Sequence, residues 1–280
     1  MTQNPKPNLQ QIFTARYSDA PEVSAAVPFG DALRSMAARG SCRAFLDKVV
    51  PAEFLEILCA AAFASPTKSD LQQRDIILLQ SPEVRSRLAA FVPSQPWVAD
   101  APVIAIFCGN NRRQRLIHEW QEIPFANDHL DAFFNAVADA AIALGAFVTA
   151  AEAVGLGCCP ISAVRNEAAA VSELLALPQH VFPLAGLAIG YPSKPVVISK
   201  RLPLAVTRHF DRYSEDGLQG VVKAYDRNRA EVQPYAQQRL MNLFGTKENY
   251  GWSDEKTRQY SQKERAEFGE YIRAQGFNLE

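Results

Sequence analysis

The feature that most constrains the fold is a long apolar segment at residues 129–155, HLDAFFNAVADAAIALGAFVTAAEAVG. After His129 its only charges are two aspartates and one glutamate, so the segment predicts one continuous helix that is apolar on most sides. Such a helix has to be covered by other elements, and we expect it to be central and largely buried. We expect it to end at Gly155 or Gly157, because glycine readily adopts the left-handed conformation that terminates helices.

Shorter segments predict the elements around this helix. Apolar runs indicate buried strands at 76–80, 101–109 and 181–192. Capping residues and apolar periodicity predict helices at 31–40, 51–64, 81–91, 166–177 and, opening with Ser253, 252–277. Residues 1–28 are rich in Pro, Gln, Ala and Ser and are interpreted as an extended N-terminal arm. Because the strands are spaced too irregularly for strict alternation with helices, the pattern favours an α+β sandwich over a doubly wound sheet.

Composition excludes several classes of protein. The 280 residues carry a net charge of −1, which gives no global field to attract nucleic acid or an anionic membrane. No uncharged apolar run reaches the roughly 20 residues that span a bilayer, and the N-terminus lacks the apolar region of a secretory signal. The five cysteines are odd in number and mostly scattered, which argues against a disulfide framework. We therefore expect a cytoplasmic protein without membrane or nucleic-acid partners.

The stretch GLGCCPISAVRN at 155–166 admits several readings. Metal binding needs three or four ligands, and the four histidines show no ligand spacing to these cysteines. A redox dithiol usually has two residues between its cysteines, so we interpret Cys158 and Cys159 as packing residues. Ser162 and Ala163 are small, and a turn before a helix start can present backbone N–H groups to a polar ligand. The alternative is an ordinary helix–strand connector.

A basic cluster points to phosphate. Arg39, Ser41 and Arg43 could converge on one phosphate group, since Arg binds phosphate bidentately and Ser adds a hydroxyl donor. Lys200 and Arg201 follow the third expected strand and could add charge to the same site. The alternative is that each is a solvated surface charge, which is the commoner fate of Arg and Lys.

Five segments in this order resemble the nitroreductase family of flavin enzymes. They are RGSCRAF (39–45), SPTKSDLQ (65–72), GLGCCPISAVRN (155–166), LAGLAIGYP (184–192) and KRLP (200–203). The longer, NADPH-preferring branch of oxygen-insensitive nitroreductases and flavin reductases is the most similar, and the resemblance covers roughly residues 30–278. It implies an α+β sandwich with a central antiparallel sheet flanked by helices, assembled as an intertwined homodimer with FMN at each interface site. We therefore expect, after the arm at 1–28, an FMN-binding domain at 29–280 that includes a C-terminal helical extension from about 204 to 280.

The resemblance also assigns roles to residues. Arg39, Ser41 and Arg43 match the first flavin-contacting motif, with Ser41 and Arg43 on the phosphate and ribityl chain. The other positions that match cofactor-binding residues are Thr67 and Ser69, which line the flavin of the other subunit, Gln95 on the isoalloxazine ring, Pro160, Ile161, Ser162 and Ala163 over one flavin face, and Arg201 on the phosphate. The backbone N–H of Ser162 is expected to donate to flavin N5.

Some positions depart from the family pattern. The branch usually has Lys two residues before the phosphate-binding Arg, whereas this chain has Ser199 there and Lys200 one place later. The loop at 244–251, which carries several basic residues in NADPH-specific relatives, has only Lys247. Arg265 matches a basic residue near the mouth of the active site. We therefore expect Lys200 to join Arg201 at the phosphate, and Lys247 and Arg265 to bind the nicotinamide cofactor.

The activity that the resemblance implies is hydride transfer from NADPH or NADH, through FMN, to a nitroaromatic, quinone or flavin acceptor by a ping-pong mechanism. No side chain is expected to act as a catalytic acid, because flavin N5 carries the hydride, and no metal is expected. The alternatives are a specialised flavin enzyme, a flavin reductase that supplies a partner, or a non-catalytic flavin-binding protein.

Overall fold

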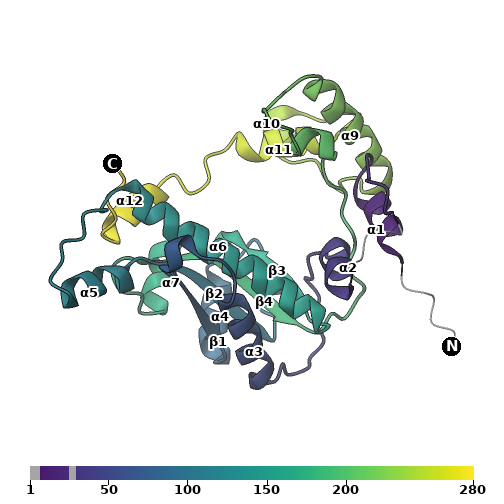
Figure 1. Cartoon of the computed structure of the whole chain (residues 1–280). Coiled ribbons are helices and arrows are strands. Elements are labelled where there is room, and N and C mark those ends of the chain that lie inside the picture. Colours follow the sequence, from purple (N-terminus) through teal and green to yellow (C-terminus); the bar gives the residue numbers. More distant parts are fainter. Residues whose placement is uncertain (1–6, 25–29) are drawn as a thin grey trace. The chain divides into compact units, whose positions relative to one another are not determined.

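The computed structural model describes residues 7–24 and 30–280, which form two compact units (Figure 1). The sheet unit comprises residues 41–196 and 265–280. The helical unit comprises residues 197–264 and the described part of 1–40. Each unit is described by itself below.

The sheet unit is built on four antiparallel strands in the order β1-β2-β4-β3. The strands are β1 (Arg74–Leu79), β2 (Val103–Asn110), β3 (Gly157–Ile161) and β4 (Val181–Gly190). Strand β2 is buried along its whole length, and its alternate residues enter two different apolar clusters, Phe107 one and Ile106 the other. This period of two is what a strand covered on both faces requires.

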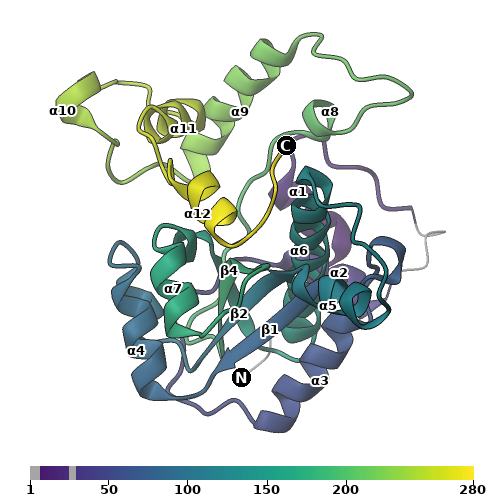
Figure 2. The same cartoon turned by 90° about the vertical axis from the view of Figure 1, so that its left-hand side faces the viewer.

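Helices cover both faces of the sheet (Figure 2). Helices α3 (Ala52–Phe63) and α6 (Leu130–Ala153) form one layer, in which Leu58 and Phe147 pack with Phe107. Helices α4 (Pro82–Ala90) and α7 (Ala168–Leu174) form the other layer, where Leu88 and Val171 pack with Ile106. The structure thus confirms the predicted α+β fold with a central antiparallel sheet flanked by helices.

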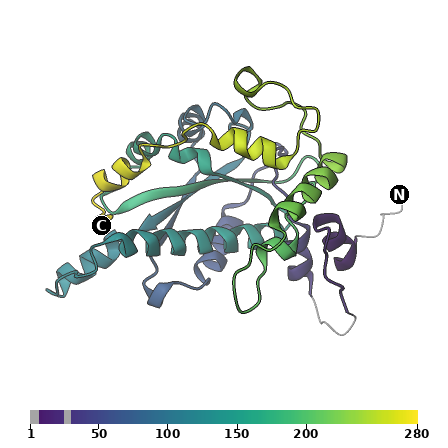
Figure 3. The same cartoon turned by 90° about the horizontal axis from the view of Figure 1, so that it is seen from above.

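The long helix α6 begins after His129, whose side chain accepts a hydrogen bond from the Asp131 N–H, and it ends before Gly155 at a φ of +84°. Figure 3 shows this teal helix extended along the strands of the sheet. Among the described residues it is the one helix whose length and composition would suffice to cross a membrane, and 39% of its apolar window is buried. The expectation of a largely buried helix is therefore wrong for one side, where Phe134 and Ile142 are exposed.

Several local expectations are corrected in the sheet unit. Residues 157–161 form strand β3 rather than part of a turn, because they pair with β4. Pro160 is compatible with this edge strand, where no ladder hydrogen bond from its nitrogen is needed. A short 3₁₀ helix, η3 (Ser162–Arg165), then precedes α7, which starts two residues later than expected. Helix α5 (Arg112–Trp120) has no counterpart among the predicted elements.

The predicted helix at 252–277 is two helices, α11 (Trp252–Tyr260) in the helical unit and α12 (Phe268–Ala274) in the sheet unit. The break includes Arg265 at a φ of +56°, which a right-handed helix does not accommodate. The sheet unit also contains two short 3₁₀ helices, η1 (Lys68–Asp70) and η2 (Pro96–Val98), and the helical unit contains the short helix α10 (Met241–Phe244).

The helical unit contains α1 (Leu9–Arg16), α2 (Asp31–Ala38), α8 (Leu204–Thr207), α9 (Leu218–Val232), α10 and α11. The expected extended arm is helical at 9–16, because Asn8 and Gln11 form a reciprocal capping box and Leu9 and Ile12 bury themselves against Ala37. Residues 1–6 and 25–28 of the expected arm lie outside the described residues.

Candidate functional site

Residues 41–45 of the first motif lie beside the third motif in the sheet unit. The Cys42 N–H donates to the Cys158 carbonyl at 3.0 Å, on the edge of β3 that faces away from β4. This approach requires a glycine, because a Cβ on Gly157 would lie 2.7 Å from both Cβ and Sγ of Cys42. The structure therefore brings Ser41 and Arg43 to the strand that leads into Pro160–Ala163.

The cysteines of this region are buried. Cys158 packs in the apolar cluster that contains Phe107, and Cys159 is 2% exposed. Burial raises the pKa of the Cys42 thiol, which favours its neutral form. All three positions suit packing. Within the described ranges, no group of three or more His, Cys, Asp or Glu side chains is placed to hold a metal ion.

Arg43 is an exposed guanidinium beside an aromatic side chain. Its Cζ lies 5.8 Å from the ring centre of Trp97, which belongs to η2 directly after Gln95. In residues 7–24 and 30–280 no ion pair or hydrogen bond engages the Arg43 side chain. Ser41 is also exposed. The structure thus groups Ser41, Arg43 and the segment of Gln95 around the edge of β3.

The segment Pro160–Ala163 combines exposed backbone with anchored side chains. Ile161 and Ala163 are buried in the cluster that contains Ile106, whereas Pro160 and Ser162 are exposed. Ser162 opens η3, and the first N–H groups of a helical turn have no partner inside that turn. Buried Ile161 and Ala163 thus anchor the segment in the core, while Pro160 and Ser162 lie at the surface, where a flat ring could approach them.

These residues fit FMN. The exposed guanidinium of Arg43 and hydroxyl of Ser41 are the donor types that bind phosphate. The small side chains at Ser162 and Ala163 leave room for a planar ring, and Gly157 lets the two segments meet. The donor set and the close approach together match a cofactor with a phosphate at one end and a ring at the other.

The second motif forms a loop with unusual backbone geometry. Ser69, Asp70 and Gln72 have φ values of +49°, +57° and +52°. Non-glycine residues pay roughly 1–2 kcal/mol each for the left-handed conformation. Such outliers are concentrated at functional sites, so Asp70 and Gln72 join Thr67 and Ser69 as candidates. Sequence reasoning missed Asp70 and Gln72, because no composition signal marks a strained loop without glycine.

A cavity of about 350 Å³ lies beside this loop. The loop contributes Lys68 and Ser69 to its lining, α5 contributes His118, and α6 contributes Asn135. Polar groups from three elements therefore face one space next to two of the predicted flavin-contacting positions.

Arg39, Lys200 and Arg201 are placed in the helical unit around Arg16. The Arg16 guanidinium donates to the carbonyls of Arg39 at 2.6 Å and of Ser199 at 3.2 Å, and its own carbonyl accepts from the Arg201 N–H at 2.9 Å. Arg201 is exposed and donates to the Ser199 hydroxyl at 2.7 Å. Sequence reasoning missed Arg16, whose burial next to these segments only the fold reveals.

The two expected nicotinamide-binding residues differ in their surroundings. In the helical unit, the Lys247 ammonium lies 2.6 Å from Asp254, which satisfies its charge locally. Burial acts to raise the pKa of Asp254, but the Gly251 N–H and Lys247 outweigh it, so the net shift is downward. In the sheet unit, Arg265 donates to the Asn166 side chain at 2.9 Å, directly after η3. Within the sheet unit, Arg265 therefore lies beside the end of η3, which follows the Pro160–Ile161 part of β3.

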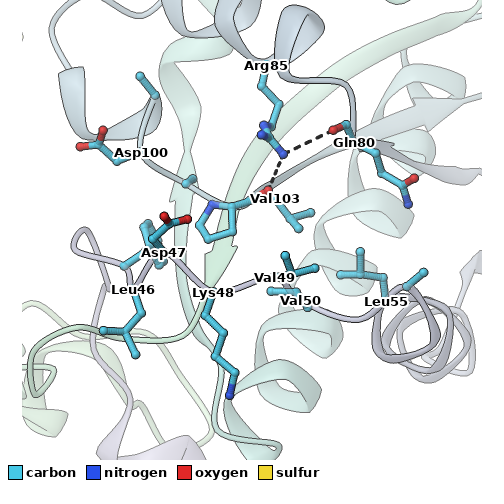
Figure 4. Close-up of a pocket in the computed structure, with 15 residues that line it drawn as sticks. Leu46, Asp47, Lys48, Val49, Val50, Leu55, Gln80, Arg85, Asp100 and Val103 are labelled. Atoms are coloured by element: carbon cyan, nitrogen blue, oxygen red, sulfur yellow. Dashed lines mark hydrogen bonds between the residues drawn. The ribbon is translucent and has the colours of Figure 1, made fainter.

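A second cavity, of about 730 Å³, is drawn in Figure 4. It lies at the other end of the sheet, lined by residues 45–50 and 99–103 among others, and none of the predicted site residues lines it. Its cations are engaged: Arg85 donates to the carbonyls of Gln80 and Pro102, and the Lys48 ammonium lies 3.9 Å from the ring centre of Tyr191. This cavity therefore lacks the free phosphate donors of the β3 edge.

Comparison with known proteins identifies the family of this chain. The Nitroreductase family profile matches residues 36–191, and the profile for the C-terminal domain of the same family matches residues 199–280. The NAD(P)H FMN reductase of Bacillus subtilis is 32% identical over 256 residues, covering 89% of this chain and 99% of the relative. The oxygen-insensitive NADPH nitroreductase of Salmonella typhimurium is 32% identical over 237 residues, covering 85% and 94%.

Solved structures show the same fold. NfrA2 of B. megaterium superposes with a TM-score of 0.82 at 30% identity, covering 90% of this chain and all of the other. The NADPH:FMN oxidoreductase of Vibrio harveyi, in complex with NAD⁺, gives a TM-score of 0.76 at 27% identity, covering 88% and 98%. With both profiles and these relatives matched over most of its length, the chain belongs to the nitroreductase family.

Proposed function

We propose that this protein is an FMN-dependent NAD(P)H oxidoreductase that reduces small-molecule acceptors. The observation that carries the proposal is the contact of the Ser41–Arg43 segment with β3, because it supports phosphate donors near the exposed Pro160 and Ser162. The relatives named as FMN reductase, NADPH nitroreductase and NADPH:FMN oxidoreductase support the same activity.

The residues of this chain bind and orient rather than react. Arg43 and Ser41 would hold the phosphate end of FMN. The phosphate roles of Arg39, Lys200 and Arg201, in the helical unit, are what the family resemblance implies. Ile161 and Ala163 anchor the backbone in the core so that the Ser162 N–H can donate to the ring, with Gln95 at its edge. Bound FMN supplies hydride transfer between the nicotinamide and the acceptor. Pro160, Ser162 and Ala163 would present only small or main-chain groups to the ring, so the electron donor and the acceptor would bind there in turn, which predicts ping-pong kinetics.

We propose that the active form is a homodimer. The exposed side of α6 carries Phe134, Ala141 and Ile142, and α3 exposes Ile57 on the same layer. An apolar helix face of this kind is typical of a surface that another subunit covers. Thr67 and Ser69 would then reach the flavin of the partner subunit. Ile142→Glu should shift the protein towards monomer in sedimentation experiments, whereas an unchanged dimer would exclude this face.

For the electron donor, we propose that Arg265 rather than Lys247 contributes to nicotinamide binding, since Asp254 already neutralises Lys247. Nitroaromatics, quinones and free flavin are the acceptor classes to compare. We also propose a cytoplasmic enzyme, because the odd number of mostly scattered cysteines suits a reducing compartment.

The test begins with FMN uptake. The purified protein should be yellow and should reduce all three acceptor classes with NADPH or NADH. Arg43→Ala should weaken FMN binding by roughly 1.5–3 kcal/mol, the usual loss for a charge-assisted hydrogen bond. Lys48→Ala, at the Figure 4 cavity, is the matched control and should retain FMN affinity. A colourless protein that takes up no FMN would contradict the proposal, and tight FMN binding without reduction would indicate a flavin-binding protein instead.

A further inference from the structure

The loop Thr67–Gln72 needs an external constraint. Three of its residues, Ser69, Asp70 and Gln72, hold left-handed backbone conformations without being glycine. A short loop free of such a constraint would relax towards the ordinary right-handed or extended regions. Hydrogen bonds from the loop to other elements must therefore hold this conformation.

A buried carboxylate on α6 supplies these hydrogen bonds. Asp139 is fully buried, and each of its oxygens accepts one backbone N–H: Oδ1 from Lys68 at 2.9 Å and Oδ2 from Gln73 at 2.8 Å. These two donors stand on either side of the left-handed residues. The carboxylate thus fixes the distance between the start and the end of the strained segment.

A buried cation accompanies this carboxylate. The Arg74 side chain is 2% exposed and its Nη1 lies 4.0 Å from Oδ2 of Asp139. Its Nη2 donates to the carbonyls of Phe63 and Ser65 at 2.6 and 3.1 Å, which fixes the chain just before the loop. The Arg74 guanidinium thus lies opposite the Asp139 carboxylate beneath the loop. Its ion pair joins β1 to α6, and its hydrogen bonds join β1 to the end of α3.

Other contacts bind the loop, but none of those described below joins both ends of the strained segment as Asp139 does. The Gln72 N–H donates to the Thr67 hydroxyl at 2.9 Å, which is a bond within the loop. Arg113 of α5 donates to the Gln72 carbonyl at 2.8 Å, but its side chain is 43% exposed. Among the described contacts, Asp139 is the buried group that binds the backbone on both sides of the left-handed residues.

We propose that Asp139 is a positioning residue for the flavin site: it holds the Thr67–Gln72 loop in the conformation that presents Thr67 and Ser69 to the cofactor. The inference rests on the proposed function, since it assigns the loop to an FMN site. It concerns a residue of the central helix that itself reaches neither flavin nor substrate. Its carboxylate acts only through the backbone that it binds.

The experiment compares Asp139→Asn with Val148→Ala in the full-length protein. The asparagine keeps the size of the side chain but turns one acceptor oxygen into an amide donor that faces a backbone N–H. Val148 is buried on the same helix in the Phe107 cluster and contacts the core rather than the loop. It therefore reports what general loss of stability does to the site.

Two measurements separate positioning from stability. In the protein without FMN, amide exchange at Lys68 and Gln73 should become faster in Asp139→Asn and remain unchanged in Val148→Ala. FMN affinity, measured by quenching of flavin fluorescence, should fall at least about tenfold in Asp139→Asn, as expected for a lost hydrogen bond to a charged group. The visible circular dichroism of bound flavin should change with it, because the ring contacts of the loop are altered.

The outcomes are distinct. Wild-type FMN affinity and flavin spectrum in Asp139→Asn would overturn the role of Asp139, as would an equal loss of FMN affinity in a Val148→Ala variant of matched melting temperature. A wild-type protein that takes up no FMN would instead contradict the proposed function, and the flavin assignment of the loop would fall with it.

Discussion

The β3 edge and the Thr67–Gln72 loop present polar groups to the proposed FMN sites by opposite means. At the β3 edge, the backbone follows ordinary strand geometry, and Ile161 and Ala163 anchor it by packing in the buried apolar cluster. In the loop, the backbone is left-handed at three residues, and buried Asp139 holds it through hydrogen bonds. Apolar burial fixes where a regular strand lies, whereas irregular backbone requires directional bonds.

The difference has consequences for mutation. The β3 edge should be sensitive to added volume, because its neighbours are already in contact. The loop should be insensitive to the identity of its exposed side chains and sensitive to the acceptor beneath it. The following substitutions examine this contrast, beginning with the largest expected effect.

Gly157→Val should be the most damaging change at the β3 edge. Its Cβ would overlap Cys42 at 2.7 Å and Cγ of Pro192 at 2.9 Å. We expect about 2–3 kcal/mol of destabilisation, near the upper end for overpacking, together with loss of FMN affinity. Urea unfolding and FMN titration measure the two effects.

The matched control is Gly269→Ala on α12, where the nearest atom to a new Cβ is Nη1 of Arg273 at 3.6 Å. There the change should stabilise by up to about 1 kcal/mol, as for Gly to Ala in a helix. Equal effects at the two glycines would mean that contact at the β3 edge is not tight.

Ala163→Leu should separate the functional part of GLGCCPISAVRN from its cysteines. The larger side chain would displace the backbone next to the ring, and a shift of this kind costs on the order of 10²-fold in kcat/KM. The double variant Cys158→Ala, Cys159→Ala should retain most of the activity although it loses some stability, because both thiols are buried packing groups. Steady-state kinetics with one quinone acceptor would measure kcat/KM for both variants. A larger loss of kcat/KM in the double cysteine variant than in Ala163→Leu would mean that the thiols take part in the reaction.

Alkaline pH should weaken the apolar cluster beneath the β3 edge. Burial, with the Asp75 carboxylate as a second cause, raises the pKa of Cys108 from 9.0 to about 12. Between these values the unfolded thiol ionises while the folded one stays neutral, so stability is lost as pH rises, by up to about 1.4 kcal/mol per pH unit. Unfolding free energies at pH 8, 9 and 10 should fall more steeply in the wild type than in Cys108→Ala. Identical slopes would exclude this thiol as the cause.

Ser69→Gly should have the smallest effect. Relief of the left-handed strain and the greater freedom of glycine in the unfolded chain oppose each other, leaving a change within about 0.5 kcal/mol. The lost bond from Lys68 is exposed and contributes little. A loss of stability well beyond this range in urea unfolding would show that the Ser69 hydroxyl holds the loop, and not the backbone hydrogen bonds to Asp139.

Sequence reasoning succeeded where the signal is local. The apolar run of α6 and its glycine terminator, the Ser81 cap of α4 and the strands β1, β2 and β4 follow from periodicity and capping, which neighbouring residues decide among themselves. It failed for β3, whose Gly-Cys-Cys-Pro sequence has no strand pattern and becomes a strand only by pairing with β4. It failed for α5 and for the helix at 9–16 because their apolar faces are short.

By itself, the sequence determined the fold class, the long helix and the ordered set of motifs that identifies the family. Only the tertiary structure decided which motifs meet: Cys42 on the carbonyl of Cys158, Arg16 on the carbonyls of Arg39 and Ser199, and Asp139 beneath a loop about 70 residues away in the chain. The physical reason is the distance along the chain over which each kind of interaction acts. Helix propensity and capping act over one or two turns, whereas hydrogen bonds between distant segments depend on where the whole core places them.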